Sequence, residues 1–410
     1  MSIDRDSIKK MIALYGSSFI GIALGFAISI FNTSVLGKEA FGDFKFIEMV
    51  FRFLASVVSV GVFVSITRML AIAKNKIYKH NLIGVFIITL AVASLIGVVF
   101  LILFSFLEPL LFSNNLGPIF RKYALLIFAV LGGIALREIL KGLNKIYTLS
   151  ILGALPAFAY LSIAYIYSLN NALYLEDILL LFYGLQFVYI AFIIYRLKPT
   201  FNIQKSLIRD VIHENKTNGR PIYYGSLAGV ATAHIVGFSL SYYIDNTQVG
   251  FYTLAMTVCS PLLIVPSVLG TTFFKKFASL DYIPKKVVFF SLLATFFALA
   301  VFYLFIEKIF MLFYSEDFYP VIGIAKILIF GFLLHGLGDL INRFLGANGQ
   351  GKLLRNAAFA VGLVNILGYT ILVYYFGVTG AVITKIIASG VYLLMMYYYY
   401  TKFTKNIKHV

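Results

Sequence analysis

The chain has 410 residues, of which 61% are hydrophobic and only 12% are charged. The core of one water-soluble domain cannot bury that much apolar surface, so a soluble globular fold is excluded. The formal net charge of +17 would suit a nucleic-acid partner, but the cations fall in alternate loops instead of on one continuous face. Composition therefore predicts an integral membrane protein with no nucleic-acid partner.

Twelve apolar runs, most of them about twenty residues long, predict twelve membrane-spanning helices. Six of these runs lie in the first half of the chain, at 11–31, 46–70, 82–107, 123–140, 147–169 and 178–197. The other six lie in the second half, at 221–243, 252–274, 287–306, 321–345, 353–376 and 378–400. The sequence thus predicts an all-α polytopic fold.

Lysine and arginine predict the orientation of these spans. They gather in the first ten residues, in every second loop and in the last ten residues, and the intervening loops hold little positive charge beyond Lys38, Lys45, Arg121, Lys122 and Lys308. Because the positively charged loops are the cytoplasmic ones, we expect both termini in the cytoplasm. The first apolar run lacks a convincing cleavage site, so we interpret it as a retained span.

The longest polar stretch, 199–220, separates a first six-helix bundle (1–198) from a second one (221–410). Its apolar residues recur at helical spacing and face away from its charged residues. The apolar set is Ile203, Leu207, Ile208, Val211 and Ile212, and the charged set is Lys205, Arg209 and Glu214. This pattern predicts either an amphipathic helix at the inner membrane surface or a partly helical, solvated linker. Either would make the connection long enough for the two bundles to move relative to each other.

The two halves repeat one another in outline. The stretch 36–68 has a glycine (Gly42), an aromatic residue (Phe44), a long apolar run and a final cation, and 246–276 repeats this order. A second similarity lies between residues 141–144 and residues 345–348, which share a glycine and an asparagine at the same spacing. Because six spans precede the joint, corresponding spans run in the same direction, as in transporters built from parallel repeats. The alternative is the loose similarity that turns of any polytopic protein share.

Four segments carry a resemblance to a known family. Residues 35–44 resemble the "LG-x-x-x-FG-x-aromatic" signature, and residues 245–255 resemble the "VG-x-Y-x-x-A" signature, of polysaccharide transporters of the O-antigen flippase (Wzx-like) type. Residues 313–318 and 376–381 are further matches. Each motif is loose, and their joint order and spacing along the chain are the specific part.

This resemblance implies a fold, a location and a function. The fold would be two parallel-repeat six-helix bundles around a central cavity that opens alternately to each side of the bacterial cytoplasmic (inner) membrane. The substrate would be an undecaprenyl-pyrophosphate-linked oligosaccharide, moved to the outer leaflet for O-antigen or capsule synthesis. A polysaccharide polymerase and a chain-length regulator would be partners. The motifs mark turns and assign no residue roles.

Charged residues inside predicted spans are the candidate site, because each costs about 2.5–3.5 kcal/mol near a span centre and normally faces protein or water. Glu48 and Arg52 lie one helical turn apart in the second span. Arginine can hold phosphate oxygens in pairs, so Arg52 would bind the phosphates while Glu48 orients it or exchanges protons. The alternative is a self-neutralising pair that lowers the cost of insertion.

The tenth span holds a second group. His335, Asp339 and Arg343 follow at four-residue intervals on one helix face. They would form a cavity lining with a proton-responsive histidine and a gating ion pair, or a static polar contact between helices. Lys326 and Lys385 lie about two turns inside their spans and would line the outward mouth or extend to the membrane surface.

Three further residues are weaker candidates. Arg68 and Arg137 lie near cytoplasmic span ends, where they would catch the incoming anionic headgroup or anchor the helices. His234 has no charged neighbour in sequence, and its default interpretation is a buried neutral histidine with one hydrogen bond.

No enzyme motif emerges. Residues 346–352 have the glycine and lysine spacing of a phosphate-binding loop, but Leu353 replaces the required hydroxyl residue and the segment joins two spans. Cys259 is the only cysteine, so no internal disulfide can form. We expect no cofactor, and energy from an H⁺ or Na⁺ gradient, the membrane potential or the substrate gradient.

Two other function classes compete with the flippase. A multidrug or small-molecule antiporter of the same superfamily would need a cavity lined mainly by carboxylates and aromatic residues, and the intramembrane cations favour the flippase. A membrane polysaccharide polymerase or ligase would need a large outer loop, and every predicted outer loop is short.

Overall fold

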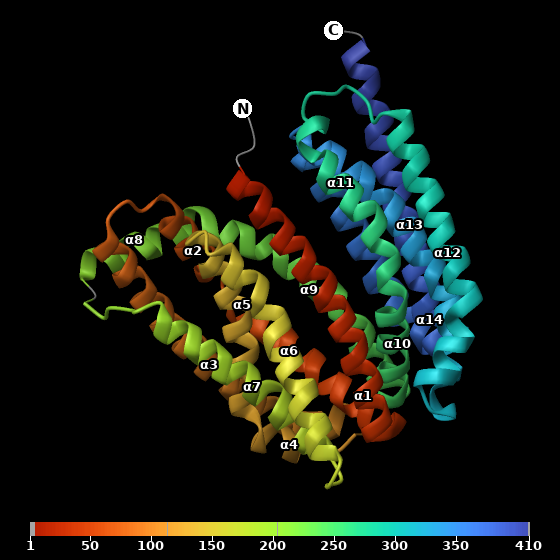
Figure 1. Cartoon of the computed structure of the whole chain (residues 1–410), viewed down its shortest axis with the longest axis horizontal. Coiled ribbons are helices and arrows are strands. Elements are labelled where there is room, and N and C mark those ends of the chain that lie inside the picture. Colours follow the sequence, from red (N-terminus) through yellow and green to blue (C-terminus); the bar gives the residue numbers. More distant parts are fainter. Residues whose placement is uncertain (1–4, 113, 203, 409–410) are drawn as a thin grey trace. The chain divides into compact units, whose positions relative to one another are not determined.

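The computed structural model describes residues 5–112, 114–202 and 204–408 (Figure 1). Every regular element within these ranges is a helix, which confirms the all-α prediction. The chain divides into two compact units, Met1–Val230 and Ala231–Val410. This boundary lies inside one helix and about ten residues beyond the joint expected at 199–220.

The first unit contains eight α-helices, two short helical turns and the start of a ninth α-helix. Their bounds are α1 (Arg5–Val58), α2 (Val62–Ile72), α3 (Lys76–Leu111), α4 (Gly117–Lys122), η1 (Ala124–Leu126), α5 (Ile127–Gly142), α6 (Ile146–Ser168), α7 (Leu175–Arg196), α8 (Lys205–Glu214), η2 (Asn215–Gly219) and α9 (Arg220–Tyr243).

The second unit contains the rest of α9 and the helices that follow it. Their bounds are α10 (Asn246–Cys259), η3 (Ser260–Leu263), α11 (Ile264–Phe277), α12 (Lys285–Phe313), η4 (Glu316–Phe318), α13 (Pro320–Ala347) and α14 (Gly351–Lys408). Helices α12, α13 and α14 lie side by side in this unit (Figure 1).

Two helices are far longer than a membrane is thick. Helix α1 has 54 residues and α14 has 58, and at about 1.5 Å per residue each would exceed 80 Å if straight, against roughly 30 Å of hydrocarbon. Each contains one break, at Gly37 with φ 71° and at Gly377 with φ 58°. Only glycine adopts such a φ without strain. The breaks divide α1 and α14 where the sequence predicts a loop between two spans.

Each predicted span lies on helical segments. Among the described residues, seven helices are long and apolar enough to cross a membrane, judged by length and composition. The fourth span combines η1 with α5, and the eighth combines α10, η3 and α11. The helices therefore agree with an all-α polytopic fold, and the twelve-pass arrangement stays a prediction.

The second predicted span contains a break that the sequence pattern does not predict. Helix α1 ends at Val58 and α2 begins at Val62. Between them Val60 has φ 44° and Gly61 has φ 74°. The Val57 carbonyl accepts a hydrogen bond of 2.6 Å from the Tyr223 hydroxyl, which comes from the start of α9. The polar joint therefore packs on this break.

Further contacts hold the joint on the first unit. Arg68 of α2 forms a 2.6 Å ion pair with Glu214 at the end of α8. The Ser65 hydroxyl donates to the side-chain oxygen of Asn215 at 3.2 Å. At the other end, the Thr200 amide donates to the His80 carbonyl at 3.2 Å. This segment is therefore docked on the first unit at both ends.

Helix α8 buries part of the predicted apolar stripe. Leu207 and Val211 are buried, whereas Ile208 and Ile212 are exposed. Ile203 lies outside the described residues. The buried pair packs α8 against the unit, and the exposed pair leaves an apolar edge of the kind that a helix at a membrane surface would present.

Candidate functional site

Glu48 of α1 is the centre of a charge cluster in the first unit. One of its carboxylate oxygens accepts a 2.9 Å hydrogen bond from the Lys45 ammonium group. The other accepts two hydrogen bonds from Arg52, from Nε at 3.0 Å and from Nη2 at 2.8 Å. The side chains of Lys45 and Glu48 are 16% exposed, whereas that of Arg52 is 55% exposed. The guanidinium group is therefore anchored along one edge and open along the other.

A second arginine reaches the same region from another helix. Arg137 of α5 is exposed and lies near enough to Arg52 for the two positive charges to repel each other. No carboxylate among the described residues pairs with Arg137, and its neighbour Glu138 pairs with Lys141 at 2.6 Å. Lys45, Arg52 and Arg137 thus supply three positive charges against the one carboxylate of Glu48.

This excess of charge favours the substrate-binding interpretation of Glu48 and Arg52, and their roles stay predictions. A self-neutralising pair would leave no net charge, but the four side chains together carry +2. Arg52 lies six residues inside the predicted span 46–70, about 9 Å along the helix at about 1.5 Å per residue. Uncompensated charge at that depth is costly in lipid. The cluster therefore needs water or an anionic ligand.

Tyr183 of α7 packs beside this cluster. Its ring lies 5.6 Å from the ring of Phe51, centroid to centroid. The residue is 2% exposed and lies close enough to Glu48 and Arg52 to interact with both charges. A tyrosine in an apolar helix carries no sequence signal of such a role, so sequence analysis missed it.

The second unit gathers the predicted residues of α13. The Arg343 Nε donates to the Asp339 carboxylate at 3.4 Å, which is a long contact. The His335 ring stacks on Tyr392 of α14 with ring centroids 4.7 Å apart and planes at 21°. The Asn342 amide donates to the Tyr392 hydroxyl at 2.8 Å. Tyr392 thus bridges two ends of the predicted polar face.

Lys385 of α14 extends this group. Its ammonium nitrogen lies 5.7 Å from the centre of the Phe332 ring, a cation–π contact. It is also near enough to His335 for electrostatic interaction. No carboxylate among the described residues pairs with it. The role of Lys385 as a substrate-binding residue stays a prediction.

Two glycines let α14 approach α13 this closely. A Cβ added at Gly331 would lie 3.3 Å from the Lys385 side chain, and one at Gly338 would lie 2.7 Å from the Tyr392 ring. Both pairs are seven residues apart on their own helix. The later glycine of α13 meets the later residue of α14, so α13 and this part of α14 run in the same direction.

The remaining predicted residues have other partners or other places. Lys326 pairs with Glu307 of α12 at 2.5 Å, and Arg68 pairs with Glu214, so neither offers an uncompensated charge. His234 lies partly buried on α9 in the second unit. The structure thus pairs Glu48 with Arg52 in one unit, with Arg137 within electrostatic range of Arg52, and gathers the α13 residues with Lys385 in the other.

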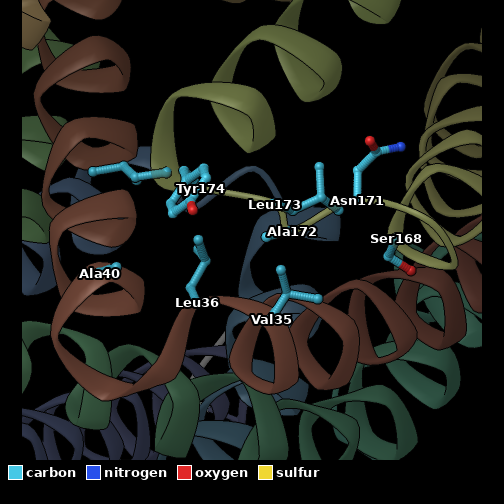
Figure 2. Close-up of a pocket in the computed structure, with 9 residues that line it drawn as sticks. Val35, Leu36, Ala40, Ser168, Asn171, Ala172, Leu173 and Tyr174 are labelled. Carbon is cyan, nitrogen blue, oxygen red and sulfur yellow. The ribbon is translucent and has the colours of Figure 1, made fainter.

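A pocket of about 460 Å³ lies at the break in α1. Figure 2 shows Tyr174 facing Leu36, with Asn171 and Ser168 to their right, where α6 ends and the loop to α7 begins. None of its lining residues is charged. The pocket suits an uncharged ligand group. It shares no lining residue with the cluster of Lys45, Glu48, Arg52 and Arg137.

Among the described residues, no group of three or more His, Cys, Asp or Glu side chains could hold a metal ion.

Comparison with known proteins identifies the family. The sequence profile described as "Polysaccharide biosynthesis protein" matches residues 7–274. The chain belongs to the polysaccharide biosynthesis protein family. This confirms the resemblance to Wzx-like transporters that the sequence motifs indicate. The matched range of this polysaccharide biosynthesis protein contains Glu48, Arg52, Arg137 and Tyr183, and it ends before His335 and Lys385.

Solved structures show which fold the chain has. It is similar to an inward-facing multidrug resistance MATE family transporter of the MOP superfamily (TM-score 0.69, 17% identity, 95% of this chain and 96% of that one). It is also similar to the lipid II flippase MurJ in an inward closed conformation (TM-score 0.72, 18% identity, 98% and 90%). A search of functionally curated sequences found no match.

The two solved structures that share this fold are a transporter and a flippase. The protein is a multi-pass membrane protein.

Proposed function

We propose that this protein is a flippase for undecaprenyl-pyrophosphate-linked oligosaccharide repeat units. It moves them from the cytoplasmic to the outer leaflet of the bacterial inner membrane, where they serve O-antigen or capsule synthesis. The observation that carries the proposal is the +2 cluster of Lys45, Glu48, Arg52 and Arg137 on membrane-spanning helices.

A diphosphate headgroup fits this cluster for two reasons. It supplies the negative charge that the cluster lacks, and its oxygens match the donor geometry of guanidinium groups. Arg52 has one edge on Glu48 and the other open. The headgroup would cross on this charged path while the polyprenyl tail stays in lipid.

The proposed architecture has twelve spans in two parallel-repeat bundles, 1–198 and 221–410, which alternate access with both termini cytoplasmic. Residues 199–220 join the bundles. A polysaccharide polymerase and a chain-length regulator are proposed partners, and an H⁺ or Na⁺ gradient is the proposed energy source. His335, Asp339, Arg343 and Lys385 would contact the headgroup from the second bundle.

The second candidate is a multidrug or small-molecule antiporter. The likeness of the fold to MATE transporters favours it. However, organic cations would be repelled by the excess positive charge around Arg52, so the cluster supports an anionic substrate.

A binding measurement separates the two candidates. We expect purified protein to bind undecaprenyl pyrophosphate more tightly than undecaprenol, which lacks the phosphates. Arg52→Ala should weaken pyrophosphate binding about tenfold or more, since hydrogen bonds to charged groups contribute about 1.5–3 kcal/mol. Lys326→Ala is the control, because Lys326 is already neutralised by Glu307. Preference for ethidium over undecaprenyl pyrophosphate would favour the antiporter and contradict the flippase.

A further inference from the structure

The hydroxyl group of Tyr183 is buried. The residue is 2% exposed, and its hydroxyl makes no hydrogen bond to any residue that the structure describes. Phe51 and Phe182 pack on its ring with centroids at 5.6 Å and 5.1 Å. A buried hydroxyl without a partner is destabilising, and native proteins keep few of them. Phenylalanine would fill the same space without that cost, so the hydroxyl needs a reason.

Glu48 and Arg52 are the charges that act on this hydroxyl. In the structure, both hydrogen bonds from Arg52 converge on one oxygen of Glu48, and Lys45 holds the other oxygen. If Arg52 turned toward a ligand, the first oxygen would lose both of its donors. Lys45 would still pair with the second oxygen, but a buried carboxylate oxygen that loses its donors is destabilising. A replacement donor would therefore ease the release of Arg52.

We propose that Tyr183 is a positioning residue whose hydroxyl donates to Glu48 when Arg52 leaves that carboxylate for a phosphate oxygen of the substrate. This inference rests on the proposed function, because it needs an anionic ligand for Arg52. The hydroxyl makes no hydrogen bond to any described residue, so it is free to donate to Glu48 when Arg52 turns away. Tyr183 acts through Glu48 and Arg52, with no contact to the headgroup of its own.

The test is Tyr183→Phe, measured for both stability and binding. The variant removes a buried hydroxyl that makes no hydrogen bond, so its melting temperature should be unchanged or higher. Its affinity for undecaprenyl pyrophosphate should fall about tenfold, the scale of one hydrogen bond to a charged group. A merely structural tyrosine would give the opposite pair of results, with lower stability or unaltered affinity, and either would overturn the inference.

Two control variants calibrate these readouts. Ser94→Ala removes another buried hydroxyl without a partner, on α3, and should leave affinity unchanged. Tyr160→Phe removes a hydroxyl that donates to Asn32 at 2.6 Å, and should lower the melting temperature because Asn32 then loses its partner. If Ser94→Ala weakened binding as much as Tyr183→Phe, the effect would not be specific to Tyr183 and the inference would fail.

A double variant tests the route through Glu48. With Glu48→Gln the carboxylate charge is absent, so adding Tyr183→Phe should cause no further loss of affinity. Equal losses from Tyr183→Phe in both backgrounds would overturn the proposed route. If the unmodified protein binds undecaprenyl pyrophosphate no better than undecaprenol, the flippase proposal itself fails. If it binds and Tyr183→Phe matches it, only the role of Tyr183 fails.

Discussion

Gly338 of α13 is the residue that admits the Tyr392 ring beside His335. A Cβ added at Gly338 would lie 2.7 Å and 2.8 Å from two ring carbons of Tyr392. We therefore expect Gly338→Ala to push the ring away from His335 and to destabilise the protein by about 1–3 kcal/mol, the usual cost of overpacking. The melting temperature of the purified protein measures this effect.

Gly323 provides the matched control on the same helix. A Cβ there meets nothing within 4 Å, and alanine is the better helix former. Gly323→Ala should leave the melting temperature unchanged or raise it slightly. Equal melting temperatures for the two variants would contradict the packing described for Tyr392.

Residue patterns predict neighbours on one helix and miss neighbours from another. The spacing of His335, Asp339 and Arg343 predicts one face, and the structure places them on one face of α13. The position of Lys45, three residues before Glu48, would have predicted their ion pair by the same rule. Tyr183 and Tyr392 reach their clusters from distant helices, and among 28 tyrosines nothing local distinguishes them.

The break between α1 and α2 is the element on which the polar joint packs. A Cβ added at Gly61 would overlap the carbonyl oxygen of Gly219, and the residue has φ 74°. Gly61→Ala should therefore lower the melting temperature and loosen the segment 198–223. Limited proteolysis should show faster cleavage within that segment than in the unmodified protein.

The variant Gly37→Ala is a control that introduces backbone strain without a steric clash. Gly37 also has a positive φ, 71°, but a Cβ there meets nothing within 4 Å. It should cost only the backbone strain of about 1–2 kcal/mol and leave cleavage in the joint unchanged. Faster cleavage in the Gly37 variant than in the Gly61 variant would contradict docking of the joint on the break.

Helix positions are predictable where hydrophobicity changes and unpredictable where it does not. The breaks at Gly37 and Gly377 fall at polar or glycine-containing gaps between apolar runs, so the sequence predicts them as loops. The break at Gly61 lies inside one apolar run, 46–70, and a single glycine in such a run is ambiguous. Only the packing of Tyr223 and Gly219 distinguishes a broken span from a straight one.

The topology of the whole molecule can be tested by cysteine labelling. Cys259 is buried, so background labelling should be low. We expect a membrane-impermeant maleimide on intact cells to label cysteine introduced at the exposed positions Asn171 and Glu316. Cysteine at the exposed positions Lys145 and Lys352 should react only after the membrane is opened. The reverse pattern would invert the proposed orientation.

Translocation is the property of the whole molecule on which the proposed function depends. The most direct measurement reconstitutes the protein in liposomes with fluorescent undecaprenyl-pyrophosphate-linked N-acetylglucosamine and quenches the outer leaflet with dithionite. We predict that the protein exposes inner-leaflet lipid to quenching and that Arg52→Ala abolishes this exposure while still inserting. Equal quenching of protein-containing and empty liposomes would contradict the proposed flippase function. Equal quenching with Arg52→Ala and with the unmodified protein would contradict the role of Arg52.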